Sequence, residues 1–213
     1  MSQILDLLNS ELGKTVISGV SESTSTDEHK TNSVLTMALP VLMKAMERNA
    51  KSESGAEGLM GALQKDHDGS ILDNLGDLFR GGVDEEVKND GSKILGHILG
   101  NKQRGVEQVI GQKAGVDSSS VANILKVAAP ILMGILGKQT QQKQINSQND
   151  LGGLLGGLLG GNAHNKKEQS FLEQILDADG DGSIVDDVAG MVLGGNKNKS
   201  DGLGGLLGGL FGK

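Results

Sequence analysis

Cysteine, tryptophan and tyrosine are absent from this chain of 213 residues, which has only two prolines. Without cysteine, neither a disulfide frame nor a thiolate metal site can form. Three phenylalanines are the only aromatic residues, which disfavours a β-sandwich or barrel because pleated faces draw on aromatic side chains. No apolar run approaches the roughly 20 residues of a spanning helix, and no basic stretch precedes an apolar run at the N-terminus. We therefore expect a cytoplasmic protein.

Small and aliphatic residues make up most of what is present. Leu, Ile, Val, Ala and Met supply the apolar side chains, which suits helices, and glycine occupies 34 positions. The net charge is −7 and the isoelectric point is about 5.1. An acidic chain is poorly suited to non-specific binding of nucleic acid or anionic membranes. The composition predicts an all-α fold punctuated by glycine.

One segment is expected to form a buried helix over residues 30–49. Its apolar side chains surround nearly the whole helix, and a helix without a polar face is typical of a core position. Pro40 lies in its interior, where a proline removes a hydrogen bond and predicts a kink.

The same pattern occurs a second time. The run VLTMALPVLMKAM (34–46) aligns without a gap with ILKVAAPILMGIL (124–136), so that Pro40 matches Pro130. Further along, DHDGSILDNLGDL (66–78) resembles DGDGSIVDDVAGM (179–191). Because both elements recur in the same order, we predict an internal repeat of two similar compact helical units.

These matches divide the chain into five parts. They are a first helical unit (1–82), a second helical unit (83–140), a Gly/Leu/Gln-rich linker (141–167), a helix–acidic loop–helix element that completes the second unit (168–195), and a Gly/Leu-rich tail (196–213). Glycine costs up to about 1 kcal/mol per residue in a helix. We therefore expect the linker and the tail to be disordered.

The second unit resembles a known family. The stretches ILGHILG (94–100), IGQKAGVDSSSVANIL (110–125) and AAPILMGILG (128–137) are similar to the YidB-like family of bacterial proteins of unknown function. The resemblance is strongest over about residues 90–140. It implies a compact, loosely homeodomain-like all-helical fold, and it implies no activity.

A calcium loop is the strongest local site prediction, at residues 177–188. Carboxylates at positions 1, 3 and 5 followed by glycine match the first half of an EF-hand loop, because Ca²⁺ takes six to eight oxygen ligands. Position 12, normally a bidentate Glu, is Val188. The candidate ligands are Asp177, Asp179, Asp181, Ser183 and Asp187.

A weaker copy of this loop contains Asp66 and Asp68. The alternative interpretation of both copies is a helix N-terminus, in which Ser70 and Ser183 cap helices and an aspartate follows in the first turn. Crowded carboxylates repel one another without a cation, which favours metal in the second copy.

Two other features point to partners of different kinds. Residues 110–126 have the spacing of a helix-turn-helix, whose second helix can enter the major groove; the alternative is a helical hairpin with few base-reading side chains. The Gly/Leu tracts at 152–161 and 202–213 could lie on a membrane surface or a partner helix, and their exposed leucines predict self-association.

No combination of residues typical of a catalytic site is found. The four histidines are far apart in the sequence, and His97, beside an apolar stripe, is expected to pack in the core. We therefore predict a non-enzymatic binding or scaffold protein that takes a protein partner or forms a homo-oligomer. A nucleic-acid-associated protein and a membrane-surface or self-associating protein are the alternatives.

Overall fold

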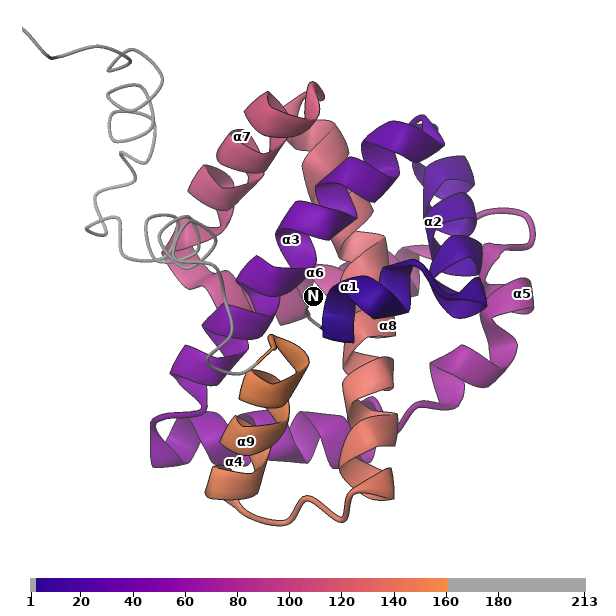
Figure 1. Cartoon of the computed structure of the whole chain (residues 1–213). Helices are drawn as coiled ribbons and strands as arrows, with labels where there is room; N and C mark the ends of the chain where they lie inside the picture. The colour runs from indigo at the N-terminus through magenta and orange to yellow at the C-terminus, as the bar shows by residue number, and fades with distance from the viewer. Residues whose placement is uncertain (1–2, 161–213) are drawn as a thin grey trace, which may run out of the picture.

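The computed structural model describes residues 3–160, and the regular structure in that range is entirely helical (Figure 1). The predicted all-α class is confirmed. In chain order the α-helices are α1 (Gln3–Leu8), α2 (Glu11–Thr24), α3 (Glu28–Asn49), α4 (Glu53–Gly61), α5 (Leu75–Phe79), α6 (Glu85–Leu99), α7 (Gln103–Ala114), α8 (Ser118–Gln142) and α9 (Gln148–Leu158). Three further segments of residues 3–160 are short helices of other geometry. Segment η1 (Ala62–Asp66) is π-helical, and η2 (Ser70–Asn74) and η3 (Gly100–Lys102) are 3₁₀-helical.

Helix α8 runs through the centre of the molecule (Figure 1). It contacts α2, α3, α6, α7, η1 and η2. Within residues 3–160 it is the one helix long and apolar enough to cross a membrane, but 72% of its most apolar window is buried inside the protein. The central helix of a bundle has the same composition, because neighbours cover it on every side.

Helices α3 and α8 both begin on an aspartate. The carboxylate of Asp27 accepts hydrogen bonds from the amides of His29 and Lys30 at 2.9 and 3.2 Å, and that of Asp117 accepts one from the amide of Ser120 at 2.9 Å. These caps satisfy amides that a helix leaves unpaired at its start. The buried helix predicted at 30–49 is confirmed, with its start at Glu28 because Asp27 is the cap.

Both proline helices contribute to a single hydrophobic core. Val34 and Leu42 of α3 are as fully buried as Ile124 and Leu136 of α8, all at 0% exposure. Helices α3 and α8 also contact each other directly. The division into two similar units therefore stays a prediction, although the prolines that suggested it both lie inside long helices.

The expected linker at 141–167 differs from the structure in its central part. Residues 148–158 form α9, which starts on a Ser147 cap and packs on α3 and α4. Its leucines are buried, with Leu151 and Leu155 at 0% exposure, whereas its glycines face open space. Burial of the leucine face offsets the low helix propensity of glycine. Residues 161–167, the element at 168–195 and the tail lie outside the described residues.

Close packing sets the position of α6 against α8. A Cβ atom on Gly91 would overlap the carbonyl oxygen of Lys126, so the two backbones approach within a distance that only glycine permits. This contact fixes α6 as one wall of the cleft described below.

Candidate functional site

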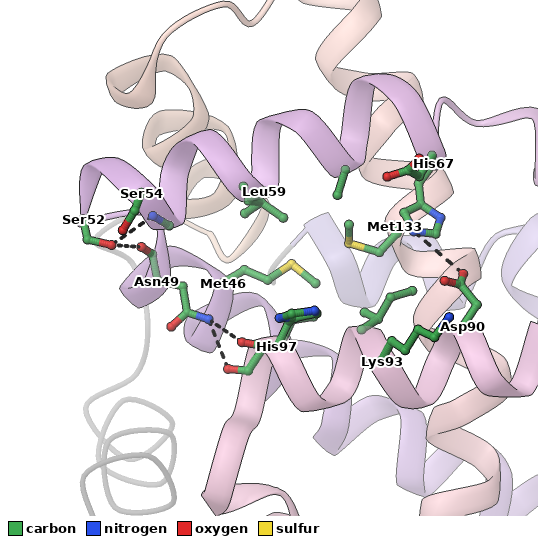
Figure 2. A pocket seen from close by; sticks show the side chains of 16 residues that line it. Met46, Asn49, Ser52, Ser54, Leu59, His67, Asp90, Lys93, His97 and Met133 are labelled. Carbon is green, nitrogen blue, oxygen red and sulfur yellow. Dashed lines mark hydrogen bonds and ion pairs between the residues drawn. The ribbon is translucent and has the colours of Figure 1, made fainter.

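A cleft of about 670 Å³ separates α4 and η1 from α6 (Figure 2). Its volume lies within the range of ligand sites in proteins, roughly 300–1,000 Å³. Residues from α3 and α8 form its floor. Segments far apart in sequence therefore build one concave site.

The floor of the cleft is apolar. Met46 of α3 and Met133 of α8 lie between the two walls at the base of the cleft, with exposures of 1% and 3% (Figure 2). Leu59 of α4 and Ile94 and Ile98 of α6 continue this surface. Methionine is unbranched and polarizable, so it adapts to side chains of different shape. Such a floor suits an apolar ligand or segment.

The α4 wall is built from small residues. Gly55 and Gly58 of α4 and Ala62 at the start of η1 line the cleft at spacings of three and four, which place them on one face of the wall. Gly55 is required by packing, since a Cβ there would overlap the carbonyl oxygen of Asn49. Gly58 is different, because no atom lies within 4 Å of a Cβ built on it. The wall at Gly58 is open to a closely approaching group.

A polar pair closes one end of the cleft. His67 Nε2 lies 3.8 Å from Asp90 Oδ2, across from η1 to α6 (Figure 2). The His67 amide bonds to the Ala62 carbonyl at 2.9 Å, which is the five-residue pattern of a π-turn. This turn, η1, directs the imidazole toward Asp90. Lys93 and Asp66 lie beside the pair.

Asn49 secures the opposite end. Its side-chain amide donates to the carbonyls of His97 and Ile98, each at 3.2 Å. These are among the last carbonyls of α6, which a helix leaves unpaired. The bonds tie the end of α3 to the end of α6. His97 is exposed and lines the cleft, so the prediction that it packs in the core was wrong. His97 lies at the edge of the adjacent apolar stripe, whose Ile94 and Ile98 also line the cleft but are buried.

The segment that holds His67 is anchored on α8. A Cβ on Gly137 would overlap the His67 carbonyl oxygen, and one on Gly134 would overlap the side chain of Ile71. Lys138 Nζ lies 3.4 Å from Asp73 Oδ1, and Gln141 Nε2 donates to the Asp68 carbonyl at 3.1 Å. Two glycines thus let the backbone of 67–71 lie directly on α8.

Asp68 serves as a local cap. Its carboxylate accepts a hydrogen bond from the Ser70 amide at 3.0 Å, and the backbone and side-chain bonds from Ser70 lower the pKa of Asp68. Ser70, predicted to be the cap, is instead the first residue of η2, and the N-cap position is Gly69. The capping hydrogen bond is instead accepted by Asp68, two residues earlier. Gly69, at φ 105°, turns the chain so that the Ser70 amide faces the Asp68 carboxylate.

The metal prediction concerns two loops, of which the structure describes the first. Within residues 3–160, no group of three or more His, Asp or Glu side chains gathers so as to hold a metal ion; Asp66 faces the cleft and Asp68 caps η2. The stronger candidates Asp177, Asp179, Asp181, Ser183 and Asp187 lie outside the described residues. Calcium binding at 177–188 stays a prediction.

The helix-turn-helix spacing at 110–126 corresponds to the end of α7, a left-handed Gly115 and the start of α8. The apolar positions Val121, Ile124 and Leu125 are fully buried. Asn123 is exposed, and half-buried Lys126 lines a polar pocket with it beside Glu85 and Lys88. The Lys88 side chain donates to Glu85, which lowers the pKa of that carboxyl. The base-reading surface that this helix offers is small.

Sequence reasoning missed the cleft. Its lining residues extend from Met46 to Met133, and no local spacing connects them. Glycine at position 58, inside a short helix where glycine lowers helix stability, was a signal that the sequence offered.

A family of bacterial proteins of unknown function (DUF937) has a sequence model that matches residues 6–139. The match covers α2 to α7 and most of α8, including the cleft-lining parts of α3, α4 and α6. No curated protein and no solved structure matches the chain.

Proposed function

The chain belongs to the DUF937 family of bacterial proteins of unknown function, also called YidB-like, and from this premise we propose that it is a non-enzymatic binding protein whose α4–α6 cleft receives an apolar helical segment of a protein. The observation that carries the proposal is the methionine floor beside an open glycine wall. Met46 and Met133 lie between the walls, and nothing within the described residues covers Gly58.

Helix α9 supports a helical ligand over a small molecule. It packs its leucines on α3 and α4 and keeps its glycines outward. One side of α4 therefore already packs against a Leu-rich helix, and a different side of α4 lines the cleft. Helix-in-groove recognition reads apolar anchors at three- and four-residue spacings.

Charge favours a protein partner over nucleic acid. The chain carries a net charge of −7, which repels phosphate backbones, and Asp66 and Asp90 lie at the cleft. Neither observation depends on the calcium loop, so the proposal is independent of metal.

A fluorescent peptide-binding assay tests this function. Gly58→Cys, in a chain without other cysteines, carries an environment-sensitive fluorophore, and circular dichroism checks folding. A synthetic peptide with the α9 sequence 148–159 is titrated in. We expect a saturable blue shift in the micromolar range, and none with the peptide in which the leucines at 154 and 155 are serine.

A fluorophore at Gly153→Cys is the matched control. Gly153 is likewise an exposed helical glycine with open space around it, but it does not line the cleft. Equal responses at both positions, or equal responses to both peptides, would contradict binding in the cleft.

A further inference from the structure

The sequence of α9 recurs near the C-terminus. Residues 151–159 read LGGLLGGLL and residues 203–211 read LGGLLGGLF. The two segments differ at one position, where Leu159 corresponds to Phe211. Any face that suits the leucines of α9 has the right chemistry for residues 203–211.

The structure shows how this sequence packs in its first occurrence. In α9 the side chains of Leu151, Leu154, Leu155 and Leu158 are buried, with exposures of 5% or less. Gly152, Gly153, Gly156 and Gly157 have open space around them. Gln148 fixes the start of the helix by donating to the carbonyls of Ala50 and Lys51 at 2.9 and 3.1 Å. The repeat is therefore a one-sided apolar helix.

The cleft matches such a helix in length. Its α6 wall runs from Asp90 to Ile98, a rise of about 12 Å in a helix, which is also the rise from Leu203 to Phe211 in the α9 conformation. The open wall at Gly58 permits a close approach, and Met46 and Met133 can adapt to leucine or phenylalanine.

We propose that residues 203–211 of the same chain occupy the α4–α6 cleft. This inference rests on the proposed function and names the occupant of that site. The 41 residues between Gly160 and Gly202 connect residues 203–211 to the end of α9 within the same chain. A tether of this length holds its end at a high effective concentration, which favours the chain's own segment over a second copy. The tail is thus a competitor that an external partner must displace.

A disulfide between introduced cysteines tests the occupant in the full chain. Gly58→Cys is combined with Leu207→Cys, and Gly153→Cys with Leu207→Cys is the matched control. Under mild oxidation in dilute solution we expect the first pair to close within one chain at least tenfold faster than the second. Equal rates would overturn the proposal, and closure only between chains would assign the cleft to a second copy.

A second measurement separates this inference from the proposed function. Leu206→Glu with Leu207→Glu in the full chain should remove the internal competitor, so the 148–159 peptide should bind the fluorophore-labelled variant at least tenfold more tightly than the labelled parent. Equal, saturable binding to both leaves the cleft as a peptide site and overturns the tail as its occupant. No binding to either, together with no selective disulfide, would overturn both proposals.

Discussion

Helices α3 and α8 start in the same way but are covered by different elements. Their caps Asp27 and Asp117 lie 90 positions apart, as do Pro40 and Pro130. The residue two before each cap is left-handed, Ser25 at φ 52° and Gly115 at φ 68°. Corresponding positions then diverge: α8 has glycines at 134 and 137, where α3 has Lys44 and Glu47.

That divergence decides where the cleft ends. The glycines of α8 admit the backbone of 67–71, which carries His67 to the cleft, whereas Lys44 and Glu47 of α3 form a half-buried ion pair at 2.9 Å. Helix α3 is covered by α9 instead. Helices α3 and α8 share the positions of their cap and proline, yet they are covered by different segments. The difference arises because α8 has glycine at two positions where α3 has charged residues.

The largest expected effect tests the packing of α9 on α3. Leu155→Ala should lower the free energy of unfolding by about 3 kcal/mol, because a fully buried leucine leaves a cavity. Urea denaturation measures the loss. Gly153→Ala, on the open face of the same helix, is the control and should raise stability by about 0.5–1 kcal/mol. A loss below about 0.5 kcal/mol for Leu155→Ala would show that α9 does not pack on α3.

The next effect tests the packing of residues 67–71 on α8. Gly137→Ala should lower the free energy of unfolding by about 2 kcal/mol, because the new methyl group overlaps the His67 carbonyl and the backbone must shift. The matched change Glu47→Ala on α3 should cost about 0.5 kcal/mol, as expected for a partly exposed ion pair. Equal losses in urea denaturation would remove the distinction between the two helices.

A third pair concerns matched core positions. The hydroxyl of Thr31 in α3 is buried without a hydrogen-bond partner, and the corresponding residue of α8 is the buried Val121. Thr31→Val should stabilise the protein by about 1 kcal/mol because it removes an unsatisfied polar group of the same shape. Val121→Thr should destabilise it by a similar amount. Thermal unfolding measures both, and a loss on Thr31→Val would mean that the hydroxyl is bonded.

The smallest effect concerns the cap of α8 in acid. Hydrogen bonds from the Ser119 side chain, then from the Ser120 side chain and amide, hold the pKa of Asp117 well below its usual range. The stabilisation is present above the unfolded pKa of about 3.9 and is lost as pH falls through the folded value. Asp117→Asn should therefore flatten the fall in Tm at low pH.

Removal of the hydroxyl donors is the control for this cap. Ser119→Ala with Ser120→Ala should raise the folded pKa of Asp117 toward its unfolded value, so the acid loss in Tm becomes smaller and is complete at a higher pH. An unchanged profile in both variants would show that this cap contributes nothing measurable to the acid response.

The sequence predicted some elements correctly for identifiable reasons. The apolar side chains on all sides of residues 30–49 predicted α3 with an error of two residues at its start. A helix without a polar face is stable only in a core. The tract at 152–161 gave the opposite result. Its glycines predicted disorder from helix propensity alone. In the structure its leucines pack on α3 and α4 as part of α9. Propensity is local, and the burial that overrides it is not.

The site shows the same limit. His97 was expected in the core because its neighbours in sequence are apolar, but its own side of α6 faces the cleft. His67 was noticed only as one of four scattered histidines, and a π-turn and Gly137 bring it opposite Asp90.

The sequence by itself determined the all-α class and the buried helix α3, because hydrogen bonding within a helix and the period of its apolar face depend on neighbours three and four positions away. Tertiary structure alone decided which face of each helix would be covered and which would stay open. That choice depends on close backbone contacts, at Gly91 against Lys126 and at Gly137 against His67, between residues too distant in sequence for any local pattern to connect.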